Sequence, residues 1–310
     1  MGRVSAPPSG RIAILGFGLI GGSIARALAK TGSSVSSVSG RPAVVAWSPS
    51  GVGPARAVHD GVIDEASATM LGALEGADLL VIAAPPLETI GIIAGLGAEG
   101  RGRLAKDAVI TDVASTKGII VNAAAQAGLR FVGGHPMAGL EATGYAAGRA
   151  DLFVDRPWVI VPPRPEDPAA VARVRWLALA CGARPMELGA GDHDAAVAAI
   201  SHLPLVASAA LVEAVAGGGE GSEADPAWPL AAEIAAGGWT SMTRLARGDA
   251  RMGAGIAATN AAALAADLRR FRAVLDSWIS ALESADGVDA TALEARLRTA
   301  RARLVERDSA

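Results

Sequence analysis

The sequence of 310 residues has a single cysteine, Cys181, and only 4% aromatic residues. One cysteine cannot form an internal disulfide framework, and a lone buried thiol is far commoner than a catalytic one. Neither sign of charge dominates, because 28 Lys and Arg residues face 31 Asp and Glu residues. The net charge of -3 gives no electrostatic reason to expect nucleic acid as a partner.

Long apolar runs are missing as well. No uninterrupted run of about 18 apolar residues occurs, and residues 1–10 lack the apolar core of a secretory signal peptide. We therefore expect neither a membrane-bound nor a secreted protein, and the reducing cytoplasm suits the cysteine content. With 51% hydrophobic residues, the chain is long enough for two domains of ordinary size.

Short apolar segments alternate with helical patterns over the first part of the chain. Helices are predicted over 19–30 and 168–181. The segments predicted as buried strands are 11–15, 44–47, 79–83, 108–111, 130–132, 158–161 and 184–188. Such alternation is typical of an α/β fold, a mostly parallel sheet covered by helices on both faces.

The pattern changes near residue 190, where strand signals fade and Ala- and Leu-rich helical segments begin. We therefore expect an α/β domain over residues 1–188 and an all-helical domain over 189–310. Helices predicted over 191–216 and 256–282 are too apolar to be solvated all round, so we expect them to pack together and against a second subunit in a homodimer. Residues 33–42, rich in Ser and Gly, are predicted to form a mobile loop.

A glycine fingerprint follows the first predicted strand. In Gly16-x-Gly18-x-x-Gly21, the first glycine permits a tight turn, the second lets the backbone approach a pyrophosphate, and the third lets helix pack on strand. The N-terminus of the next helix, at Leu19 and Ile20, offers unpaired N–H groups and a dipole that favour phosphate. This pattern predicts a Rossmann-type dinucleotide site.

The position that would select the cofactor is not acidic. A carboxylate at the end of the second strand would bind the ribose hydroxyls of NAD, and this position holds Ser48. Without a negative charge there, a 2′-phosphate is not repelled, and Arg56 could contact one. We expect NAD or NADP, with a slight preference for NADP. That Ser48 and Arg56 are ordinary loop and helix-surface residues is an equally good interpretation.

Two further strand ends carry rigid or polar groups at the edge where an open parallel sheet binds its ligand. Pro85 follows the strand at 79–83 and is expected beside the nicotinamide ribose. Asp112, Ser115 and Lys117 follow the strand at 108–111. Turn formation and capping are common alternatives for Asp and Ser at such places.

A histidine lies in a Gly- and Pro-rich turn behind the apolar run at 130–132. His135 is a candidate general base, because an unperturbed pKa of about 6.5 lets the imidazole take a proton at working pH. His202 is either a site residue or a satisfied core histidine, while His59 and His193 are interpreted as surface or cap residues. No ligand cluster has metal-binding spacing, so we expect no metal.

Five motifs together resemble the prephenate/arogenate dehydrogenase family, in order and in approximate spacing, from about residue 11 to 275. They are Gly16-x-Gly18-x-x-Gly21, Asp112-x-x-Ser115-x-Lys117, Gly134-His135-Pro-Met-Ala-Gly139-x-Glu141, Ser201-His202-Leu-Pro204 and Thr243-Arg244. The histidine-containing motifs are considerably more specific than the glycine fingerprint.

The resemblance implies an oxidoreductase that uses NAD or NADP to convert prephenate to 4-hydroxyphenylpyruvate in tyrosine biosynthesis, or arogenate to tyrosine. It implies that His135 accepts the substrate's hydroxyl proton, that Ser115 hydrogen-bonds nearby, and that Arg244 holds the ring carboxylate. A guanidinium offers a planar fork of donors that matches a carboxylate. The other residues expected to line the substrate site are Glu141, Lys117 and His202.

Two other functions compete with this one. A β-hydroxyacid dehydrogenase has a similar layout but relies on a lysine in the helical domain, and no lysine follows Lys117. A dinucleotide-binding sensor without turnover would bind NAD(P) and tolerate the loss of His135. One departure from some relatives is Gly253, where they carry a tryptophan on the wall of the substrate pocket.

Overall fold

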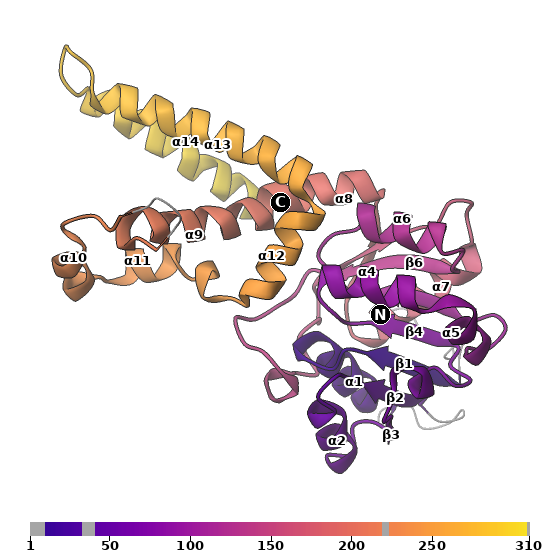
Figure 1. Cartoon of the computed structure of the whole chain (residues 1–310). Helices are drawn as coiled ribbons and strands as arrows, with labels where there is room; N and C mark the ends of the chain where they lie inside the picture. The colour runs from indigo at the N-terminus through magenta and orange to yellow at the C-terminus, as the bar shows by residue number, and fades with distance from the viewer. Residues whose placement is uncertain (1–9, 33–40, 219–222, 309–310) are drawn as a thin grey trace. The chain divides into compact units, whose positions relative to one another are not determined.

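The computed structural model describes residues 10–32, 41–218 and 223–308, and its centre is an eight-stranded sheet (Figure 1). The strand order is β3-β2-β1-β4-β5-β6-β7-β8, and every neighbouring pair is parallel except β6 and β7. The strands are β1 (Arg11–Leu15), β2 (Ala43–Trp47), β3 (Glu65–Ala66), β4 (Leu79–Ile82), β5 (Val109–Asp112), β6 (Phe131–Pro136), β7 (Pro157–Val161) and β8 (Arg184–Glu187). The α/β prediction is confirmed; β3 was not predicted, and most of the predicted loop over 33–42 lies outside the described residues.

Helices cover both faces of the sheet (Figure 1). In chain order they are α1 (Leu19–Gly32), α2 (Val52–His59), α3 (Met70–Ala73), α4 (Pro86–Gly95), α5 (Gly97–Arg103), α6 (Gly118–Gln126) and α7 (Pro168–Ala180). The helical segment that follows contains α8 (Ala190–Val197), α9 (Leu203–Ala216), α10 (Trp228–Ile234), α11 (Gly237–Met242), α12 (Ala250–Thr259), α13 (Ala261–Leu282) and α14 (Ala290–Asp308). A π-helical turn, Ala198–His202, joins α8 to α9.

Two apolar cores sandwich the sheet, and β1 contributes to both. Ile12 and Ile14 pack in the core under α1, α2 and α7, whereas Ala13 and Leu15 pack in the core under α3, α4 and α6. Successive side chains of a strand point to opposite faces, so a strand covered on both sides must be apolar throughout. This requirement explains why the central strands stood out as continuous apolar runs.

Strand β6 is longer than predicted, and it contains His135. The expected turn after residue 132 is instead the continuation of the strand, because residues 133–136 pair antiparallel with β7, with His135 opposite Val159. Glycine is needed within this stretch, since a Cβ on Gly134 would lie 2.5 Å from the backbone oxygen of Asp112. The imidazole is therefore carried by a buried strand, which positions it more rigidly than a turn would.

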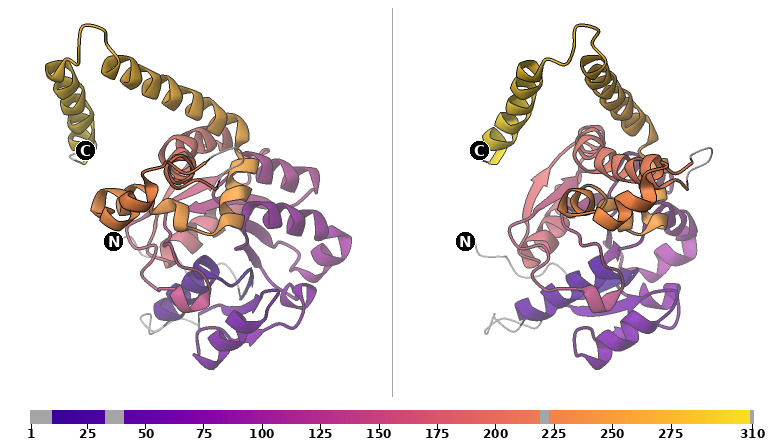
Figure 2. Two further views of the ribbon diagram at one scale, coloured as in Figure 1. Left: turned by 60° about the vertical axis from the view of Figure 1, so that its left-hand side comes forward. Right: turned by 90° about the vertical axis from the view of Figure 1, so that its left-hand side faces the viewer.

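The helical elements up to α12 adjoin the α/β part (Figure 2), where α8 packs against α6 and α12 packs against α4. The helix predicted over 191–216 is confirmed as one continuous helical stretch. The helix predicted over 256–282 is divided, because Asn260 ends α12 before α13 begins. The chain forms two compact units, residues 1–264 and 265–310. A domain boundary at residue 188 stays a prediction.

The stretch Ala190–Ala216 is the one described helix that is long and apolar enough, by length and composition, to cross a membrane. Helices of soluble proteins meet the same two criteria, so the observation is weak evidence for a membrane. Only 22% of its most apolar window is buried. Most of that window is therefore not fully buried within the described part of the chain.

We expect Gly134→Ala to lower the free energy of unfolding by about 1–3 kcal/mol, because the new methyl group would collide with backbone rather than with a flexible side chain. Chemical denaturation measures the change. Gly139→Ala is the matched control, since a Cβ there meets nothing within 4 Å. Equal stability of the two variants would show that β6 and β5 can separate at little cost.

Candidate active site

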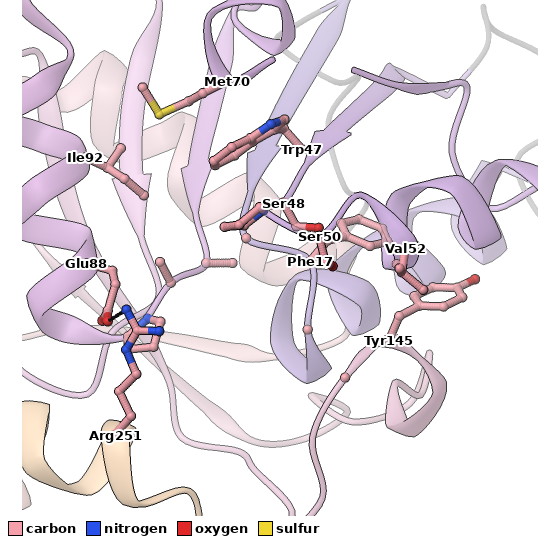
Figure 3. Close-up of a pocket in the computed structure, with 18 of the residues that line it drawn as sticks. Phe17, Trp47, Ser48, Ser50, Val52, Met70, Glu88, Ile92, Tyr145 and Arg251 are labelled. Atoms are coloured by element: carbon pink, nitrogen blue, oxygen red, sulfur yellow. Dashed lines mark ion pairs between the residues drawn. The ribbon is translucent and has the colours of Figure 1, made fainter. Parts of the chain in front are cut away.

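A pocket of about 850 Å³ opens at the carboxyl ends of β1, β2 and β4 (Figure 3). Of the predicted cofactor residues, Gly16, Gly18, Ser48 and Pro85 line it. The others are not part of the described lining: Leu19, Ile20 and Gly21 form the first turn of α1, and Asp112 is fully buried. Pocket residues that the sequence did not indicate include Trp47, Met70, Glu88, Tyr145 and Arg251.

The glycine fingerprint has the geometry that a pyrophosphate requires. Gly16 has a φ of 90°, and a Cβ there would lie 2.3 Å from the backbone oxygen of Ala83. A Cβ at Gly18 would meet nothing within 4 Å, so the backbone faces open space that a side chain would fill. Helix α1 has no acidic residue in its first turn, which leaves its N–H groups and dipole to an anion. The residues fit a dinucleotide.

The pocket's charged groups lie at two places. Ser48 and Ser50 follow β2 and Arg56 lies on α2, while the one carboxylate in the described lining, Glu88, lies on α4. Glu88 is paired with Arg251, so α4 and α12 are joined by an ion pair across the pocket wall (Figure 3). The β2 end therefore offers hydroxyls and one cation to whatever binds there.

His135 belongs to a chain of three hydrogen-bonded side chains. Its Nδ1 lies 2.8 Å from Nε2 of His193, whose Nδ1 lies 2.8 Å from Oδ1 of Asp194. The carboxylate of Asp194 also accepts the backbone N–H groups of Lys117 and Gly118 at the start of α6, each at 2.8 Å. The interpretation of His193 as a surface or cap residue is wrong, because its side chain is 1% exposed. The only hint in the sequence is its neighbour, Asp194.

Burial shifts the ionisation of this chain. It lowers the pKa of His135 well below the ordinary value, and the charge of the nearby Lys117 ammonium shifts it the same way. For Asp194, burial alone would raise the pKa, but hydrogen bonds from His193 and from two backbone N–H groups outweigh it and lower the pKa. At neutral pH, an uncharged imidazole thus lies two hydrogen bonds from an ionised carboxylate.

Lys117 and Asp112 form an ion pair with no exposed surface. The Lys117 ammonium also donates to the backbone oxygen of Gly134 at 2.8 Å, and the Asp112 carboxylate accepts the N–H groups of Ala114 and Gly134. Burial lowers the pKa of Lys117 even though Asp112 opposes the shift. Both side chains are fully buried, and their predicted contacts with substrate and cofactor stay predictions. Together they fasten the end of β5 to β6 beside His135.

His202 joins the same network through Asn260. The Asn260 amide nitrogen donates to the backbone oxygen of Asp194 at 2.8 Å and lies 3.1 Å from Nδ1 of His202. Burial lowers the pKa of His202 to about 4. Its Nε2 is buried without a partner among the described residues. One of its two nitrogens therefore lacks the hydrogen bond that a satisfied core histidine would have.

The remaining predicted substrate residues lie in two places. Ser115 is half-buried, and its neighbour Thr116 is held by a 2.9 Å hydrogen bond to Thr259 of α12. Arg244 and Glu141 form an ion pair whose side chains are 56% and 39% exposed. Among the described residues, no hydrogen bond or ion pair links that pair to His135. The structure thus groups the predicted residues into a buried histidine network and an exposed Arg–Glu pair.

Two other expectations concern side chains outside these groups. Cys181 is packed in an apolar core, where burial raises the pKa of its thiol, so the thiolate is disfavoured. Within the described ranges, no cluster of three or more His, Cys, Asp or Glu side chains could hold a metal ion.

Comparison with known proteins gives one family over both halves of the chain. The model of the prephenate dehydrogenase nucleotide-binding domain matches residues 24–187, and the model of the prephenate dehydrogenase dimerization domain matches residues 189–295. A cyclohexadienyl dehydrogenase of Zymomonas mobilis is 32% identical over 89% of each chain. A prephenate dehydrogenase of Bacillus subtilis is 31% identical over 76% of this chain and 60% of its own length. The chain thus spans under two thirds of that relative.

Solved structures share the fold along nearly the whole chain. The arogenate dehydrogenase of Synechocystis has a TM-score of 0.72 and 30% identity, over 96% of this chain and 99% of its own. The prephenate dehydrogenase of A. aeolicus, in complex with hydroxyphenyl propionate and NAD+, has a TM-score of 0.81 over 96% and 97% of the two chains. At 24% identity, that second likeness bears on the fold alone.

We expect stability to fall with pH below about 6.5. His135 and His202 are uncharged in the folded protein, whereas in the unfolded chain they take up protons near pH 6.5. The unfolded state therefore binds more protons as pH falls, and the contribution from His202 is lost between pH 6.5 and about 4. Urea midpoints over this range measure the effect.

Two variants test whether the buried histidines cause this fall in stability. His202→Gln should flatten the fall, because it removes one of the two groups. His59→Gln, at an exposed position, should leave it unchanged. A wild-type midpoint that does not move between pH 7 and 5 would contradict the neutral buried histidines.

Proposed function

We propose that this chain, which belongs to the prephenate dehydrogenase family, catalyses the NAD(P)-dependent oxidative decarboxylation of prephenate to 4-hydroxyphenylpyruvate in tyrosine biosynthesis. The observation that carries the proposal is the position of His135. It is a buried, neutral imidazole on the strand next to β5, and β5 pairs with β4 at the pocket edge, Ile82 opposite Asp112. A base and a dinucleotide cradle therefore occupy the same edge of one sheet.

In this reaction the protein has to orient the substrate and the nicotinamide and to remove one proton. The ring carbon that bears the hydroxyl loses a hydride, the hydroxyl loses its proton, and the ring carboxylate departs as carbon dioxide, which leaves an aromatic ring. A bound nicotinamide would supply the hydride acceptor. Nε2 of His135 takes the hydroxyl proton, and Ser115 hydrogen-bonds beside it. Because aromatisation drives the reaction, positioned groups suffice.

Substrate binding is the role we propose for Arg244, Glu141 and His202. The Arg244 guanidinium remains half exposed while it pairs with Glu141, so it is oriented and still open to a carboxylate. His202 has a buried nitrogen that has no partner among the described residues, and a polar ligand atom would satisfy it. For Lys117 and Asp112, the contacts support a structural role next to His135 rather than contact with ligand.

Arogenate is the alternative substrate. It differs from prephenate by an amino group in place of the side-chain keto group, and the likeness to the arogenate dehydrogenase of Synechocystis over nearly the whole chain favours keeping it. For the cofactor, the two serines and Arg56 at the end of β2 support a slight preference for NADP over NAD.

We further propose a homodimer built by the helical part of the chain, with a domain boundary near residue 188, in the cytoplasm. The matches to separate nucleotide-binding and dimerization models on either side of that position support the boundary. Apolar side chains that remain exposed on this segment support burial against a second copy. They include Ile200, Leu230, Ile234 and Met242.

Initial rates with prephenate or arogenate, each with NAD or NADP, test the function. We expect turnover with prephenate, faster with NADP, and a loss of kcat of roughly a hundredfold or more in His135→Asn with substrate binding retained. Turnover only with arogenate would select the alternative substrate. Dinucleotide binding without turnover of any combination would overturn the dehydrogenase and favour a sensor.

Arg244→Gln should mainly raise KM, by an amount equivalent to about 2–4 kcal/mol, because a carboxylate loses its charged partner. Steady-state kinetics at saturating cofactor separates KM from kcat. Arg247→Gln, in the same exposed turn, is the matched control and should leave KM near the wild-type value. If both variants keep their KM, the substrate carboxylate binds elsewhere.

A further inference from the structure

The carboxylate of Asp194 determines which atoms donate and which accept along the hydrogen-bond chain from His135 to Asp194. An ionised carboxylate can only accept, and Asp194 already accepts two backbone N–H groups at the start of α6. Nδ1 of His193 must therefore carry a hydrogen and donate a hydrogen bond to Asp194. In a neutral imidazole one nitrogen donates and the other accepts, so Nε2 of His193 is an acceptor.

The tautomer of His135 follows from that of His193. Nδ1 of His135 faces the accepting Nε2 of His193 at 2.8 Å, so Nδ1 of His135 carries the proton. Its Nε2 is then left with the lone pair, and that atom makes no hydrogen bond with any of the described residues. The opposite arrangement would require a proton on Nε2 of His193 as well, which would make that buried ring a cation.

His202 is held as the opposite tautomer, with its proton on Nε2. The atom of Asn260 that lies 2.8 Å from the backbone oxygen of Asp194 must be the amide nitrogen, because a carbonyl oxygen only accepts. That nitrogen also lies against Nδ1 of His202, so Nδ1 accepts and Nε2 carries the proton. The buried nitrogen without a partner is thus an N–H donor.

We propose that His193 and Asp194 are positioning residues that hold His135 with its proton on Nδ1 and its Nε2 free to accept, while Asp194, through Asn260, holds His202 with its proton on Nε2. One residue would thereby give the site an acceptor and a donor from two identical side chains. The part that concerns catalysis rests on the proposed function; the two tautomers do not.

During the reaction this arrangement has a second consequence. The substrate O–H bond breaks, an N–H bond forms at Nε2 of His135, and the ring becomes an imidazolium. Its Nδ1–H then points at the lone pair of His193, which is backed by the negative charge of Asp194. The positive charge is stabilised where solvent cannot reach it, as in other acid–base chains that end in a carboxylate.

Nitrogen NMR of the protein labelled with 15N-histidine reads the tautomers directly, without any substrate. The chain has four histidines, so single variants assign the signals. In the wild type we expect a protonated Nδ1 and an unprotonated Nε2 for His135, and the reverse for His202. In His193→Leu, which removes the acceptor, we expect His135 to lose its preference for Nδ1–H. A wild-type His135 with its proton on Nε2 would overturn the proposal.

Kinetics then tests the link to catalysis. His193→Leu should lower kcat roughly 10- to 100-fold, a part of the 10²–10⁴-fold that a positioned base contributes, with KM and dinucleotide affinity unchanged. His193→Gln should recover part of the loss, since its amide oxygen can accept from Nδ1 of His135. His59→Gln, at the surface, should match the wild type. Circular dichroism verifies that each variant folds.

The two readouts separate failure of the inference from failure of the proposed function. Unchanged kcat in His193→Leu, in an enzyme that His135→Asn inactivates, would overturn the positioning role alone. An equal loss in His193→Leu and His193→Gln, accompanied by raised KM, would mean that His193 only packs, and this too would overturn it. Were no dehydrogenase activity found, the NMR result would still decide the tautomers.

Discussion

The carboxylate of Asp194 is the interaction on which the site depends. It lies on α8, the first helix after the sheet, and it accepts the first N–H groups of α6, which follows β5. A helix N-terminus has unpaired donors and a partial positive charge, so a buried carboxylate is stabilised there. This contact is one of those that join the helical segment to the α/β part, and it also sets the hydrogen-bond direction in the histidine network. Fold and chemistry are coupled because the same group serves both.

Two groups of strand ends at the same edge of the sheet carry different parts of the candidate site. The ends of β1, β2 and β4 form the dinucleotide pocket, where close-packed backbone leaves no room for a Cβ at Gly16. The ends of β5 and β6 carry the candidate acid–base groups, and the buried pair of Lys117 and Asp112 fastens these two strands. A buried ion pair is costly to form but specific in geometry, since either partner alone would be an uncompensated charge. Its value here is the fixed position of β6.

Much of the fold followed from local pattern, and the exceptions have physical reasons. Strands buried on both faces must be apolar, so their runs were visible, whereas β3 has two exposed residues and no pattern to detect. His135 stood out, but Gly and Pro around it suggested a turn, although the glycines serve close packing against β5. Asn260 divides a predicted helix because its side chain bonds to Asp194 and His202, which are remote in sequence.

The sequence by itself indicated the α/β class, the glycine fingerprint and the candidate base, because each of these is encoded by residues only a few positions apart. Folding alone revealed the partners of that base. His193 follows His135 by 58 positions and had been interpreted as a surface residue, yet the two rings are in hydrogen-bond contact. Local sequence carries no signal for such a contact, since it arises only when α8 packs against α6. Chemistry that depends on the direction of a hydrogen bond is therefore decided by tertiary packing.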